Sequence, residues 1–260
     1  MQFLLHLPVP VSIIVVLAVS IGLSVLGLKF VRKRYPQEVL KENHEVAGFV
    51  YNAFMLIYAV LVAFVVYVTW SNYDETKKNA EMEANLIVDV FSDAQGLPDT
   101  MRVNSRSAFS EYVRLIIDEE WSAMERGTFS PDAGNAFRKI WGIYFNTDVI
   151  KIINQEAYKE SLNRLNKLGE YRRMRIIASK SHMPGLIWLV LIVCAVTSVG
   201  YTYFFGTKNL RAQYVMTSVL ALINGLILYL IFVLDHPFNG NTKITGTVFI
   251  EIQRLIDHVM

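Results

Sequence analysis

Side chains able to do acid–base or metal chemistry are few in this chain, and they are scattered. The five histidines lie far apart, and only Asp235 and His236 set a carboxylate beside an imidazole. Neighbours in a chain need not face each other, so this pair alone predicts no metal site. No P-loop, dinucleotide fingerprint, nucleophile elbow or zincin motif is present. We therefore expect no enzyme, no catalytic or metal-binding residue and no cofactor.

Acidic side chains on helical segments offer a second possible chemistry, calcium binding. Their spacing matches no EF-hand loop, so we expect them to form a solvated helix face instead. The residues concerned are Glu119-Glu120, Asp89, Asp93 and Asp99.

Two asparagines stand inside long apolar runs. Asn52 lies within 46–70 and Asn224 within 214–234. An unpaired amide at membrane depth costs a few kcal/mol, so each should face protein or water. An interhelical hydrogen bond and a position facing a water-filled path both satisfy this requirement.

The distribution of charge indicates a polytopic membrane protein. Charged residues make up 18% of the 260 residues, against about a quarter in soluble domains, and they are missing from four long windows. We predict an all-α fold with four transmembrane helices and a helical extramembrane section between the second and third. The predicted boundaries are spans at 8–28, 46–70 (helical to about 95), 184–205 and 214–234, a soluble section at 72–181, and an amphipathic tail at 235–260 containing Phe249, Ile250 and Ile256.

Capping residues divide the soluble section into further helices. Asp99 or Thr100 begins one that runs to Gly127, and Ser130-Pro131 reads as the N-cap and first residue of the next. Thr147 or Asp148 is expected to begin a long last helix, with an apolar stripe from Val149 to Ile177. The net charge of +2 is too small to indicate nucleic-acid binding.

Charged residues at the ends of the spans allow two interpretations each. Arg32 and Arg34 either anchor the first span at lipid headgroups or attract anions to a pore mouth. Asp235, followed by His236, either accepts hydrogen bonds from the turn that follows or supplies a mouth carboxylate. Basic residues are nearly equal on the two sides, so the side of the soluble section is undecided, and we expect the protein in the cytoplasmic membrane.

Several stretches resemble the bestrophin-like membrane domain family of prokaryotes and plants. They are YAVLVAFVVYVTW, EYVRLIIDEEWSAM, RRMRIIASKSHMPGLIWLVL with the YFFG that follows, and LDHPFNG, and the resemblance covers about residues 10–255. The family is similar to the bestrophins, which are oligomeric anion channels with a pore lined by the second span. Counting back from Tyr73, the apolar neck of bestrophins falls on Asn52, Leu56 and Val60. Their calcium clasp has no recognisable counterpart.

The resemblance and the uncharged second span together predict a homo-oligomeric ion channel. Its partners would be further copies of the chain, membrane lipid and small inorganic ions, anions above all. The residues expected to line the pore are Asn52, Leu56, Ala59, Val60, Ala63 and Tyr67. A non-conducting membrane sensor or scaffold is the alternative, and an enzyme acting on lipid has no motif behind it.

Overall fold

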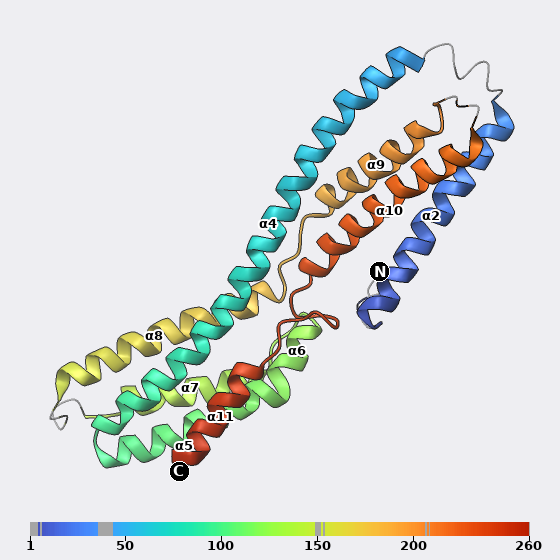
Figure 1. Cartoon of the computed structure of the whole chain (residues 1–260). Helices are drawn as coiled ribbons and strands as arrows, with labels where there is room; N and C mark the ends of the chain where they lie inside the picture. Colours follow the sequence, from blue (N-terminus) through green and yellow to red (C-terminus); the bar gives the residue numbers. More distant parts are fainter. Residues whose placement is uncertain are drawn as a thin grey trace. The chain divides into compact units, whose positions relative to one another are not determined.

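Figure 1 shows a computed structural model of the chain, which describes residues 5, 7–35, 44–148, 152, 154–205, 207 and 209–259. Every regular element of these residues is a helix, which confirms the predicted all-α class. The chain forms two compact units. The first comprises Met1–Asn72, His182–His236 and Gly240–Thr242, and the second comprises Tyr73–Ser181, Pro237–Asn239 and Lys243–Met260.

The first unit contains the apolar helices of an integral membrane protein. Four helices are long and apolar enough to cross a membrane. They are α2 (Val9–Arg34), the first part of α4 (His44–Asp93), α9 (Gly185–Thr202) and α10 (Leu210–Leu234).

Helix α10 packs against both α2 and α9 (Figure 1). A Cβ on Gly225 of α10 would lie 2.4 Å from the Ser20 hydroxyl of α2, so the absent side chain is what allows this approach. Lipid tails are as apolar as the helix surfaces, and helices in a membrane therefore associate through such close contacts between small residues.

Helix α4 packs on its neighbours along one side only. Tyr58, Val62 and Val65 are buried in a cluster with Leu191 and Ala195 of α9 and Ile231 of α10. The helix continues without interruption to Asp93, since no Gly or Pro lies between Gly48 and Gly96. A short 3-10 turn, η1 (Ala94–Gly96), follows it.

The second unit is a helical domain around α5 (Asp99–Leu115). Phe109, Tyr112 and Val113 of α5 are fully buried at its centre. The remaining elements are the last part of α4, the π-helical turn η2 (Ile116–Glu120), α6 (Trp121–Glu125), α7 (Pro131–Phe145), α8 (Gln155–Ala178) and α11 (Thr247–Val259).

Local signals set several of these helix ends. The Ser130 hydroxyl accepts from the backbone N–H of Ala133 with Pro131 as the first helical residue, as the sequence predicts. Gly127 adopts a left-handed conformation, with φ of 69°, after α6. The expected N-cap at Thr147 or Asp148 is wrong, because α8 begins at Gln155, where the Asn154 side chain accepts from Ala157 N–H. Val149 and Ile153 of the predicted stripe lie outside the described residues.

The last helix, α11, is built into the second unit. Phe249 and Ile256, two of the apolar residues named in the predicted tail, are buried in its core, whereas the third, Ile250, is 39% exposed. The indole N–H of Trp121 donates to the carbonyl of Ile244 at 3.0 Å, which fixes the segment that leads into α11.

Candidate functional site

The side of α4 that faces away from α9 and α10 carries all six residues predicted to line a pore. Each is exposed in the single chain, with exposed fractions of 69% for Leu56, 50% for Val60 and 63% for Tyr67. Successive residues of an α-helix are rotated by about 100° around its axis, and on this basis the six side chains project within an arc of about 100°. The centre of that arc lies about 140° around the helix from the buried residues Tyr58, Val62, Val65 and Thr69. We call this arc, consisting of Asn52, Leu56, Ala59, Val60, Ala63 and Tyr67, the open face of α4.

The two membrane asparagines have different environments. Asn224 is buried, and its amide oxygen accepts from the Tyr58 hydroxyl at 2.8 Å while its nitrogen donates to the Ser198 hydroxyl at 3.0 Å. It therefore makes the interhelical hydrogen bonds that tie α10 to α4 and α9. Asn52 lies on the open face, exposed, and has no hydrogen-bond partner among the described side chains. Hydrogen bonds to a second copy of the chain, or to water along a path through the membrane, would satisfy the Asn52 amide.

Arg32 and Arg34, both near the end of α2, also differ. The Arg32 guanidinium donates to the Gln213 side chain and, at 3.2 Å, to the Thr207 carbonyl, so it joins α2 to the start of α10. Gln213 in turn donates to the carbonyl of Thr202. Arg34 is exposed. Arg32 is thus held in place by protein, and Arg34 is the freer of the two cations.

Asp235 lies at the end of α10 and is 8% exposed. Its carboxylate accepts from the backbone N–H of Met183 at 2.7 Å and from the Trp188 indole at 3.4 Å. The prediction that it accepts from the turn following it is wrong, because its donor precedes α9, far away in sequence. His236 is half-buried, and burial lowers the pKa of its imidazole.

The structure adds His182 to this pair, a residue that the sequence reasoning passed over. Its ring stacks on that of His236 with centroids 4.7 Å apart. One ligand atom from each of His182, Asp235 and His236 lies within 4.8 Å of the others. Among the described residues this is the single group of three or more His, Cys, Asp or Glu close enough to share a metal ion. Fifty-three positions separate His182 from Asp235, so no sequence spacing reveals the group.

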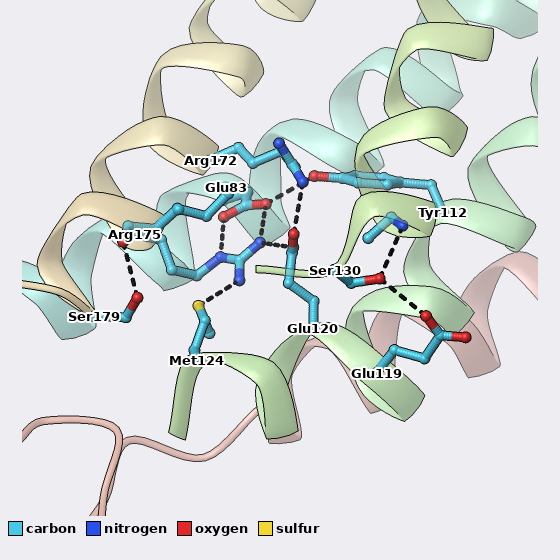
Figure 2. A network of polar contacts seen from close by, with 11 residues as sticks. Glu83, Tyr112, Glu119, Glu120, Met124, Ser130, Arg172, Arg175 and Ser179 are labelled. Atoms are coloured by element: carbon cyan, nitrogen blue, oxygen red, sulfur yellow. Dashed lines mark hydrogen bonds and ion pairs between the residues drawn. The ribbon is translucent and has the colours of Figure 1, made fainter. Parts of the chain in front are cut away.

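The second unit encloses a network of buried charges, shown in Figure 2. Arg175 of α8 binds both oxygens of Glu83 of α4, at 2.6 and 3.0 Å, and Glu120 of η2 at 2.7 Å. Arg172 binds the other oxygen of Glu120 at 2.6 Å, and the Tyr112 hydroxyl donates to Glu83 at 2.9 Å. Arg175, Glu83 and Glu120 are fully buried. The solvated face expected for Glu120 is therefore wrong.

Electrostatics keeps the Arg175 guanidinium ionised. Burial alone would lower the pKa of Arg175, but the carboxylates of Glu83 and Glu120 raise it above its usual value. Burial and the charge of Glu83 raise the pKa of Tyr112, which stays a neutral donor. The Arg175 guanidinium also lies 5.2 Å from the Trp121 ring centroid. The arrangement joins α4, η2 and α8 through buried ion pairs.

The π-turn places Glu120 in this network. Trp121 N–H donates to the carbonyl of Ile116, five residues back, so the helix holds one more residue in this turn than an α-helix would. The other acidic residues of the predicted set do not join Glu120. Asp93 pairs with Arg164 at 3.0 Å, and Asp89 and Asp99 are exposed.

Comparison with known proteins supports the same architecture. The model of the bestrophin-like domain family matches residues 18–249. Two crystal structures of variants of a bacterial bestrophin homologue from Klebsiella pneumoniae superimpose with TM-scores of 0.69 and 0.71, at 11% and 12% sequence identity. Both alignments cover 94% of this chain and 97% of the other. A likeness at this identity shows the fold alone, and no curated protein sequence matches the chain.

Proposed function

The chain belongs to the bestrophin-like domain family, and we propose that it forms a homo-oligomeric ion channel in the cytoplasmic membrane. In this proposal copies of the chain surround an axis, and the open face of α4 lines the path along it. Small anions are the proposed permeant species. The observation that carries the proposal is the position of the open face, which is opposite the packed face of α4 and free of charge.

The composition of the open face supports a narrow apolar path. Leu56 and Val60 lie one turn apart, and Ala59 and Ala63 leave room beside them. Lipid alone would favour large apolar residues on this face, whereas a bundle around an axis favours small ones. A ring of Leu56 side chains would form a constriction of the kind that controls conduction by dewetting.

The polar and charged groups of the first unit support a preference for anions. The Asn52 amide carries N–H donors and no negative charge, so a ring of such amides can replace part of the water around a halide ion. No Asp or Glu lies between Val46 and Asn72 to attract cations. The exposed Arg34 adds a positive charge at one end of α2.

Flux measurements on reconstituted protein test the proposal. The full chain in liposomes should pass chloride above the rate of empty liposomes, and Leu56→Ala should raise that flux by widening the constriction. Ile57→Ala is the matched control, since Ile57 is equally exposed, at 72%, but points about 100° away from Leu56. It should leave the flux unchanged.

Three results would overturn the proposal. They are a monomeric chain in detergent and bilayer alike, an absence of flux for every common anion, and an equal response of flux to both substitutions. An oligomer without flux would instead identify a membrane scaffold or sensor.

A further inference from the structure

His182, Asp235 and His236 meet where α9 begins and α10 ends, within the first unit. The two rings are held by the backbone. Nδ1 of His182 lies 3.0 Å from the Asp235 carbonyl, and Nδ1 of His236 lies 2.9 Å from the Phe232 carbonyl. A carbonyl oxygen only accepts hydrogen bonds, so each Nδ1 must carry the proton.

This choice of tautomer leaves the Nε2 lone pair of both rings free. A neutral imidazole that donates from one nitrogen to a backbone carbonyl and presents the other to a metal ion is the usual arrangement of histidine ligands. Both rings are therefore oriented so that Nε2 is available to a metal ion.

Asp235 supplies the negative charge. Its carboxylate is nearly buried, and none of the described ion pairs involves it. The bond from Met183 N–H uses one oxygen, while the contact to Trp188 at 3.4 Å is long, so the second oxygen retains capacity to accept. A buried carboxylate without a paired cation is unfavourable, and a metal ion would supply the missing charge.

We infer that His182, Asp235 and His236 bind a divalent transition-metal ion of the Zn²⁺ type. Two imidazole nitrogens and one carboxylate oxygen form a donor set that zinc favours, and a fourth position stays open to water. Calcium and magnesium prefer oxygen ligands alone, so this set selects against them.

The spacing of the donors is compatible with such a site. Ligand atoms around tetrahedral zinc lie about 3–4 Å apart, given bonds of about 2.0–2.2 Å. One ligand atom from each of the three residues, with either ring nitrogen counted for a histidine, lies within 4.8 Å of the others. Closing the set around an ion would need a small movement, which the exposed His182 side chain can supply. The bound ion would join the start of α9 to the end of α10.

Metal titration of the full-length, tag-free protein in detergent tests this inference. After stripping with chelator, we expect the wild type to bind about one Zn²⁺ per chain, and Co²⁺ to give the visible absorption of a tetrahedral nitrogen and oxygen site. His182→Ala and Asp235→Asn should each weaken zinc binding by about 100-fold or more. The matched control is His258→Ala, which removes an exposed histidine of α11 in the second unit and should bind as the wild type does.

The variants are checked by size-exclusion profile and by thermal midpoint in chelator, which gives each variant its own metal-free reference value. Zinc should then raise the midpoint of the wild type and of His258→Ala, but not that of His182→Ala. The inference fails if the wild type binds less than a tenth of an equivalent, if His182→Ala binds as tightly as the wild type, or if Ca²⁺ displaces Zn²⁺ at equal concentration. None of these readouts depends on conduction.

Discussion

Replacing Arg175 with methionine removes the central cation of the buried network. Methionine keeps the unbranched stem that packs in the core, so the change acts mainly through charge. Glu83 then keeps only the Tyr112 hydroxyl as a described partner, while Glu120 keeps Arg172. One fully buried carboxylate is thus left without a cation.

The expected loss of stability follows from that burial. Removing one partner of a buried ion pair costs about 3–5 kcal/mol. A matched control is Arg164→Met on the same helix, because Arg164 and its partner Asp93 keep 33% and 20% of their side chains exposed. A surface pair of this kind contributes about 1 kcal/mol or less. The two variants should therefore differ by about 2 kcal/mol or more.

Thermal unfolding of the full chain in detergent, followed by tryptophan fluorescence, measures the difference. A gap of about 2 kcal/mol corresponds to an unfolding midpoint lower by about 5 °C or more for Arg175→Met. Adding Glu83→Gln to Arg175→Met should recover part of the loss, since it removes the unpaired charge. Equal midpoints for Arg175→Met and Arg164→Met, or no recovery in the double variant, would refute the electrostatic account of this core.

The remaining predictions concern helix packing and the anchoring of α11. Gly225→Ala should lower the unfolding midpoint, because its Cβ would clash with the Ser20 hydroxyl. Gly22→Ala, whose Cβ would meet nothing within 4 Å, should leave stability unchanged or raise it by up to about 1 kcal/mol through helix propensity. Equal effects of the two substitutions would contradict the contact between α10 and α2. Trp121→Phe should keep the aromatic packing but lose the hydrogen bond to the Ile244 carbonyl, at a cost of about 1–3 kcal/mol. The loss should appear as faster proteolysis of the segment that precedes α11. An unchanged cleavage rate would contradict this anchoring.

Hydrophobic periodicity and charge-free windows were enough to predict the class of fold. A membrane span needs about 20 apolar residues, and no tertiary contact changes that requirement. The absence of Gly and Pro between Gly48 and Gly96 likewise indicates a helix that continues past Trp70, as α4 does. Local capping chemistry predicted the start of α7 at Ser130 and Pro131.

The buried network carried a signal that the sequence reasoning did not use. Glu83 follows Ala80 by three residues and precedes Ile87 by four, so it lies on the buried stripe of α4. Arg175 continues the stripe of Leu165 and Leu168 on α8 in the same way. Charged residues at the helical positions of an apolar stripe predict a buried ion pair. Which carboxylate pairs with which guanidinium is decided by the tertiary structure.

By itself the sequence determined that this is a helical membrane protein with an uncharged second span, because both properties depend on composition and spacing along one chain. Only the tertiary structure decided which asparagine is bonded and which lies open, since Asn52 and Asn224 are chemically identical. It also brought His182 close to Asp235 and His236, although fifty-three positions separate His182 from Asp235 in the sequence. This contact depends on where two helices end, and no local sequence pattern predicts it.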